Sequence, residues 1–392
     1  MSAPSPWRRA AALTLRLLLS LAVAAALYVA VDRWTIRVWD TEESFIARVS
    51  ELGPEAHVRD ESGERFPMLQ REVTARILTG ERRGQDERFS IVRLEDSGIE
   101  PIPGRRYLVV EDTFEDGTVQ RSIADAYRVP SIVALIVAFG LVLISLTGWV
   151  GFRAIVGLCV SVAVLLWGMV PLMTRGWPPV PISLAAVVVI STVTVLCVAP
   201  CARDRTAALL GSIGGVGCGF VMGCLMVQVW QLTGLAGEGA ALLASTLPGI
   251  DMRGVLMAAV LVGSIGAVLD VGVSVTAAMA ELVGYDPDVP LRRLWSAGLT
   301  VGSEVLGSMI NTLILAYLGA ALPMAILIAG AGADMLGILN DPYIGQEIVQ
   351  SLAGTAGLLS TIPVTAAAFV AQEAWIRRGR PEPWDEDEER QG

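Results

Sequence analysis

The sequence has no lysine and a single histidine, His57, so two common proton-handling side chains are almost absent from it. All 29 basic residues are arginine, which we attribute to coding bias and not to function. Because His57 lies outside the apolar segments, no histidine metal ligand, histidine proton relay or Ser–His–Asp triad is expected within a bilayer. No other nucleophile–base set or metal-binding set is visible. We therefore predict a protein that is not an enzyme and needs no cofactor or metal.

Cysteine is also scarce, and the polar part of the chain has none. The five cysteines lie in apolar segments or at their ends: Cys159, Cys197, Cys201, Cys218 and Cys224. This placement implies no disulfide framework. Cys197 and Cys201 are one helical turn apart; they form either a metal or redox pair or, as we favour, small residues packed in a helical bundle.

Charge is sparse and unevenly distributed. Charged residues make up 17% of the chain, and much of the net charge of −10 falls in residues 40–125 and 385–389. No basic stripe suited to phosphate binding is present, so we expect no nucleic-acid partner.

Long apolar runs dominate what remains, with 53% hydrophobic residues and a mean hydropathy of +0.58. Runs of 18 or more apolar residues are typical of membrane-spanning helices. We therefore predict an all-α polytopic bundle whose main partner is the lipid bilayer. Eight spans are predicted, at 11–31, 131–152, 154–174, 180–200, 206–232, 254–283, 296–319 and 347–371.

We interpret the first apolar run, residues 11–31, as a signal anchor, with a cleaved signal peptide as the alternative. In either case, we expect the segment after it to be exported. Alternating apolar residues in that segment predict short strands. They lie at 45–49, 73–78, 89–94 and 107–110 and are separated by turn signals such as Gly53-Pro54. We expect a small extracytoplasmic β-rich domain, possibly an OB-like barrel, between helices 1 and 2. The predicted domains are 1–32, 33–129, 130–375 and a disordered acidic tail, 376–392.

Arginine placement predicts the orientation in the membrane. With the N-terminus inside, ten arginines flank cytoplasmic ends and two, Arg175 and Arg253, lie in short outer loops. This bias favours cytoplasmic N- and C-termini in a bacterial inner membrane. Residues 294–340 are too long for one helix and too short for three, so we expect one crossing plus a broken or re-entrant segment over 319–337.

Asp270 is the main candidate for function, because it lies near the centre of the apolar run 254–283. An Asp at that depth costs about 2.5–3.5 kcal/mol on insertion scales, and such a residue is usually retained for a partner, a water-filled path or a cation. Either Asp270 only pairs with a neighbouring helix or it has a proton- or ion-linked role.

The next span carries a polar stripe at helical spacing, formed by Glu304, Ser308, Asn311 and Thr312. A short loop joins the two spans, so Asp270 is expected to face Glu304 or Asn311. Ser264 joins the candidates through a faint echo between residues 262–264 and 301–303. These residues form either a coupling-ion site or a structural hydrogen-bond cluster.

Four strings of the sequence carry a family resemblance: residues 266–274 with Glu281, residues 307–319 with Leu322-Pro323, residues 347–363, and residues 77–84 of the exported segment. They resemble the YibE/F-like family of bacterial membrane proteins. The resemblance covers about residues 40–375. It implies a multi-pass inner-membrane protein and carries no settled activity.

A looser resemblance to one half of the SecF and resistance-nodulation-division transporters implies use of proton flow. We therefore expect a proton- or ion-coupled transport protein in which Asp270 titrates. The alternative is a membrane scaffold or assembly factor whose β domain binds an envelope partner. A homo-oligomer is compatible with both.

Overall fold

The computed structural model describes residues 6–38, 44–59, 65–80, 82–94, 100–113, 119–199, 202–236, 238–332 and 334–378. The chain forms two compact units, Met1–Gly148 and Trp149–Gly392, and each is described by itself. The predicted disordered tail lies outside the described residues, apart from its first three positions, which are helical.

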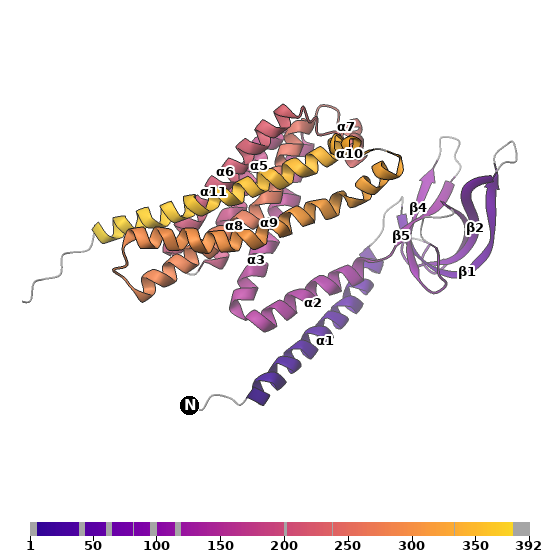
Figure 1. Ribbon diagram of the computed structural model, residues 1–392. Coiled ribbons are helices and arrows are strands. Elements are labelled where there is room, and N and C mark those ends of the chain that lie inside the picture. Colours follow the sequence, from indigo (N-terminus) through magenta and orange to yellow (C-terminus); the bar gives the residue numbers. More distant parts are fainter. Residues whose placement is uncertain are drawn as a thin grey trace, which may run out of the picture. The chain divides into compact units, whose positions relative to one another are not determined.

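Eight helices of the described chain are long and apolar enough to cross a membrane, which confirms the predicted number and indicates an integral multi-pass membrane protein. Most extend beyond the predicted apolar runs, because backbone hydrogen bonding continues past the point where the sequence becomes polar. The helical elements are α1 (Pro6–Val38), α2 (Val129–Thr147), α3 (Trp149–Ala163), η1 (Val164–Met169), α4 (Val170–Thr174), α5 (Pro179–Val198), α6 (Ala202–Val229), α7 (Glu238–Thr246), α8 (Met252–Tyr285), α9 (Leu291–Gly330), α10 (Met335–Leu339) and α11 (Pro342–Arg378) (Figure 1).

The first unit consists of α1 packed against α2, with a five-stranded antiparallel open sheet between them in sequence (Figure 1). The sheet order is β3-β2-β1-β4-β5, and Asp32 at the end of α1 pairs with Arg106 of β4. Its inward residues, including Val49, Val73 and Val109, are buried, as the alternation predicts. The strands are β1 (Ser44–Arg59), β2 (Arg65–Ile77), β3 (Asp86–Leu94), β4 (Arg106–Thr113) and β5 (Val119–Ala126).

The predicted turn at Gly53-Pro54 is wrong, because both residues lie inside β1. There the register between β1 and β2 shifts from Leu52 to Glu55, as in a β-bulge. A bulge accommodates a proline because the missing N–H is not needed by the ladder. Arg71 of β2 fixes this point by donating from Nε to the carbonyl of Gly53 at 2.9 Å.

The end strands β3 and β5 contact each other and are joined by ion pairs. Arg121 of β5 binds Glu87 of β3 at 3.2 Å and Glu111 of β4 at 2.6 Å. Arg82 binds the same two carboxylates at 3.3 and 2.7 Å. Charged side chains thus hold together the seam where the described strands form no backbone ladder.

In the second unit, α11 packs against α6, α8 and α9. Glycine makes the close approach of α6 and α11 possible, because small residues let helix backbones come near each other. A Cβ at Gly211 or Gly215 would collide with the hydroxyl of Thr365 or Thr361. At Gly219 it would lie 2.7 Å from the carbonyl of Ala353.

The predicted break within residues 319–337 is wrong over most of its length, because α9 continues without interruption to Gly330 and includes Pro323. Proline removes one hydrogen bond and crowds the carbonyl four residues earlier, and membrane helices tolerate this. The chain leaves the helix after Gly330, where Gly332 has a φ of +84°.

Candidate functional site

Asp270 lies on the side of α8 opposite the residues that pack against α6 and α11. The buried side of α8 carries Leu261, Ser264, Val268, Val271, Val275 and Met279. Asp270 falls on the opposite side and is exposed, together with Ala259, Gly263, Gly266, Ala277 and Glu281. Among the residues that the structure describes, none hydrogen-bonds or ion-pairs with its carboxylate.

The polar stripe of α9 also faces away from the bundle. Leu294, Gly298, Gly302 and Leu306 form its buried side. Glu304, Ser308 and Asn311 are exposed on the opposite side, which confirms that they share one face. The hydroxyl of Ser308 donates to the carbonyl of Val305 within the same helix, at 2.9 Å.

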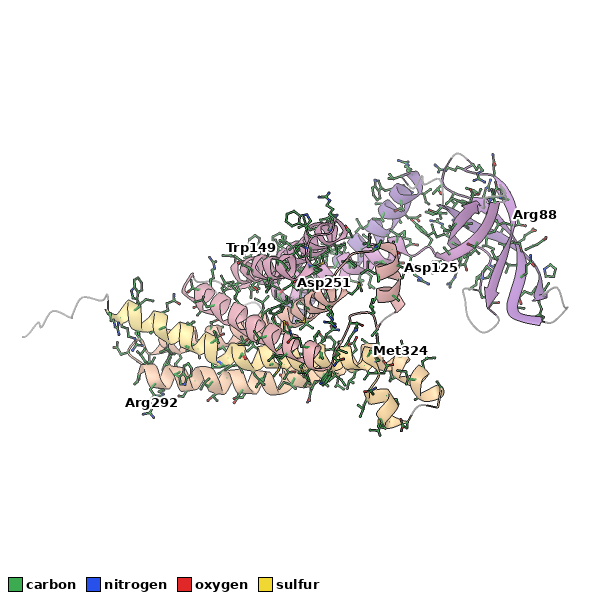
Figure 2. All side chains as sticks on the ribbon, turned by 90° about the horizontal axis from the view of Figure 1, so that it is seen from above. Arg88, Asp125, Trp149, Asp251, Arg292 and Met324 are labelled. Carbon is green, nitrogen blue, oxygen red and sulfur yellow. The ribbon has the colours of Figure 1, made fainter. Side chains whose placement is uncertain are left out.

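Two contacts fix the register between the antiparallel helices α8 and α9. The hydroxyl of Tyr317 lies against Gly263 of α8. Farther along, the sulfur of Met279 lies 2.6 Å from the Cβ position of Gly298. Both helices rise equally per residue. Counting forward along α8 and backward along α9 from either contact therefore shows which residues of the two helices lie at the same depth. Figure 2 shows Arg292 at the start of α9 and Met324 toward its other end.

Counting from both contacts places Asp270 level with residues 307–310 of α9, and therefore with Ser308. Asn311 lies about one turn farther toward Tyr317, and Glu304 one turn nearer the start of α9. The predicted neighbours of Asp270 are thus at a matching depth on the adjacent helix. No ion pair or hydrogen bond joins Asp270 to any of them among the described residues.

Ser264 does not belong to this group. It is buried on the opposite side of α8, where its Cβ lies 3.7 Å from the Cβ position of Gly354 of α11. Its hydroxyl donates to the carbonyl of Leu261 at 3.1 Å. The position that the sequence echo selected is therefore one where α8 packs against α11.

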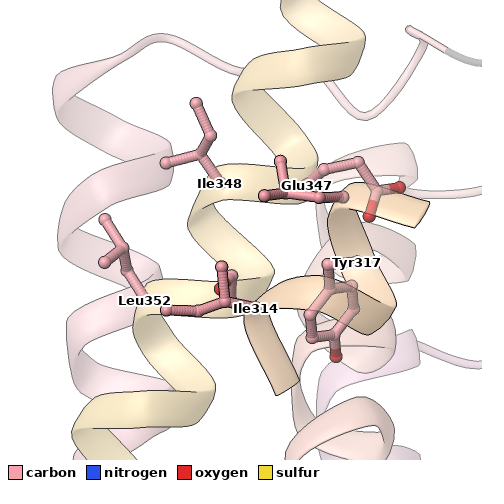
Figure 3. A pocket seen from close by; sticks show the side chains of 7 residues that line it. Ile314, Tyr317, Glu347, Ile348 and Leu352 are labelled. Carbon is pink, nitrogen blue, oxygen red and sulfur yellow. The ribbon is translucent and has the colours of Figure 1, made fainter. Parts of the chain in front are cut away.

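The structure adds a polar group that the sequence reasoning did not select. Tyr317, Glu347 and Ser351 line a pocket of about 150 Å³ between α9 and α11, in otherwise apolar surroundings (Figure 3). Glu347 stands at the first position of the predicted span 347–371, so a carboxylate at the edge of an apolar run was the available signal. No group of three or more His, Cys, Asp or Glu residues suited to a metal is found in the described chain.

A buried charge pair ties the far end of α11 to the loop before α9. Glu373 is fully buried and accepts from Arg377 Nε at 2.9 Å. Arg377 also donates to the carbonyl of Val289 at 2.8 Å, between α8 and α9. These contacts join the end of α11 to the loop between α8 and α9.

Comparison with known proteins supports the family resemblance and nothing more specific. A family model described as YibE/F-like protein matches residues 135–373, more than half of the chain. The matched range includes α8, α9 and most of α11. Searches among curated proteins and among solved structures give no match. The chain therefore belongs to the YibE/F-like protein family.

Proposed function

We propose that this protein is a proton- or ion-coupled transport protein of the bacterial inner membrane. Its N- and C-termini lie in the cytoplasm and residues 33–129 lie outside, as the arginine bias favours. The observation that carries the proposal is the depth match between Asp270 on α8 and Ser308 on α9, both far from the ends of apolar helices.

The chemistry of the proposal follows from the groups at that depth. An unpaired carboxylate in the membrane is costly unless it takes up a proton or binds a cation. At about the same depth on α9, Ser308 and Asn311 offer hydroxyl and amide oxygens, and Glu304 offers a second carboxylate one turn away. Such oxygen ligands suit a proton or a small hard cation.

The exported β domain gates the transport path or recruits a partner in this proposal. Its strand order, and the contact between β3 and β5, are compatible with an OB-like barrel whose last seam is held by ion pairs. The ion pair between Asp32 and Arg106 connects this domain to α1.

The test is proton flux into liposomes under an imposed pH gradient. Wild type is compared with Asp270→Asn and with the control Glu281→Gln, which removes a carboxylate from the same exposed side of α8 near its end. We expect Asp270→Asn to abolish gradient-driven flux and Glu281→Gln to retain it. Equal flux in all three well-folded proteins contradicts the proposal.

The second candidate is a membrane scaffold whose β domain binds an envelope partner. It is favoured by the outward direction of Asp270 and of the α9 stripe, since polar side chains on the outside of a bundle promote helix association. Under this alternative, Asp270→Asn leaves ion flux negligible and unchanged, and removal of the β domain's partner produces the same defect as loss of the protein.

A further inference from the structure

The outward face of α8 and α9 is chemically incomplete in a lipid environment. Asp270, Glu304 and Asn311 lie on it without a hydrogen-bonding partner among the described residues. Lipid chains offer no hydrogen bonds, so polar side chains in membrane helices are satisfied by other helices or by water. Something other than lipid therefore covers this face.

Two glycines on the same face have open space beside them among the described residues of the second unit. No atom lies within 4 Å of a Cβ built at Gly266 or at Gly307. The glycines that pack α6 against α11 differ, because a Cβ there would collide with α11. Open glycines beside polar side chains leave room for another helix to approach closely.

The depth match decides which partner fits. A two-fold axis along the membrane normal keeps every residue at its own depth and brings α8 of one copy opposite α9 of the other. Asp270 then faces Gly307 and Ser308 of the second copy. By the same register, Asn311 faces a stretch that begins at Gly266. The acceptor Asp270 then meets the hydroxyl of Ser308, and the side chains of Asp270 and Asn311 each meet an open glycine.

We propose that the outward face of α8 and α9 binds the same face of a second copy, so that Asp270 of each copy contacts Ser308 and Asn311 of the other. The polar cluster is complete only in this dimer. One chain supplies the carboxylate, and the other supplies the hydroxyl and the amide. The inference concerns assembly and holds with or without ion transport.

The first test counts copies by single-molecule photobleaching, using full-length protein with a fluorescent protein fused after Gly392 in liposomes at a low protein-to-lipid ratio. Wild type is expected to bleach in two steps. Gly266→Leu and Gly307→Leu are expected to lose the two-step class, because leucine fills the space that the second copy needs. Gly217→Leu is the control, since Gly217 of α6 is equally open but lies on another helix.

The second test is disulfide trapping in a chain whose native cysteines are replaced by alanine. Copies carrying Asp270→Cys are co-expressed with copies carrying Ser308→Cys, and a band of twice the monomer mass is expected. The control pair, Asp270→Cys with Gly217→Cys, is expected to give none.

One-step bleaching of wild type overturns the inference, and so does equal trapping of both cysteine pairs. Two-step bleaching that survives both leucine substitutions places the dimer contact elsewhere and also overturns it. A dimer without flux leaves the inference standing and contradicts the proposed transport. Proton flux from single copies supports the proposed transport and contradicts the dimer.

Discussion

Replacing Glu111 with glutamine is expected to open the seam between β3 and β5. Glu111 receives hydrogen bonds from Arg82 at 2.7 Å and from Arg121 at 2.6 Å, and its side chain is only 11% exposed. Glutamine keeps one acceptor but presents an amide N–H₂ to a guanidinium, and it removes the charge that holds two arginines near each other.

The magnitude follows from the exposure of the partners. A hydrogen bond to a charged group contributes about 1.5–3 kcal/mol. Arg82 is 40% exposed, so solvent screens much of its share, whereas Arg121 is 25% exposed. We expect a loss of about 2 kcal/mol, which corresponds to roughly a thirtyfold increase in the open population of the seam.

Hydrogen exchange of the full-length protein in detergent, read by mass spectrometry, measures this opening. Peptides from β3 and β5 are expected to exchange about thirtyfold faster in Glu111→Gln than in wild type, because detaching β3 from β2 or β5 from β4 also breaks the seam. Glu51→Gln, an exposed change on β1, serves as the control. Unchanged protection of both strands in Glu111→Gln refutes the idea that ion pairs hold the seam.

Three further predictions concern acid and buried contacts. Burial raises the pKa of Glu111, but hydrogen bonds and charges from Arg82 and Arg121 outweigh it and hold the pKa below its ordinary value. Its stabilisation is therefore present above about pH 4.3 and lost as pH falls through the lower folded pKa. The difference in Tm between wild type and Glu111→Gln is expected to vanish at acid pH. Gly302→Ala is expected to lower stability by about 1–3 kcal/mol because its Cβ collides with Ile362. Glu373→Ala is expected to lower stability by about 3 kcal/mol, because the partly buried charge of Arg377 loses its carboxylate partner. Both are read as a fall in Tm in detergent, and an unchanged Tm contradicts the packing described.

Hydropathy predicts how many helices span the membrane, because each apolar run is long enough to be unambiguous. It does not predict where a helix ends, since hydrogen bonding within the helix carries α9 past Pro323 to Gly330. The strand runs were predictable from alternation, whereas the bulge at Gly53-Pro54 was not, since it depends on how β1 meets β2.

The candidate site, too, could be predicted from the sequence only in part. The depth of Asp270 is readable from its place in an apolar run, and the shared face of Glu304, Ser308 and Asn311 follows from helical spacing. The sequence does not show whether these side chains point into the bundle or out of it, because that depends on which side of each helix packs against α6 and α11. For that reason Ser264, chosen by a sequence echo, lies on the buried side, and Asp270 on the outer side.

In the proposed function, the carboxylate of Asp270 takes up and releases a proton within the membrane. Infrared difference spectra of the protein in lipid, recorded between acidic and neutral pH, detect this protonation. We expect a carboxyl C=O band that is lost in Asp270→Asn and retained in Glu281→Gln. Identical difference spectra for wild type and Asp270→Asn are inconsistent with proton exchange at Asp270.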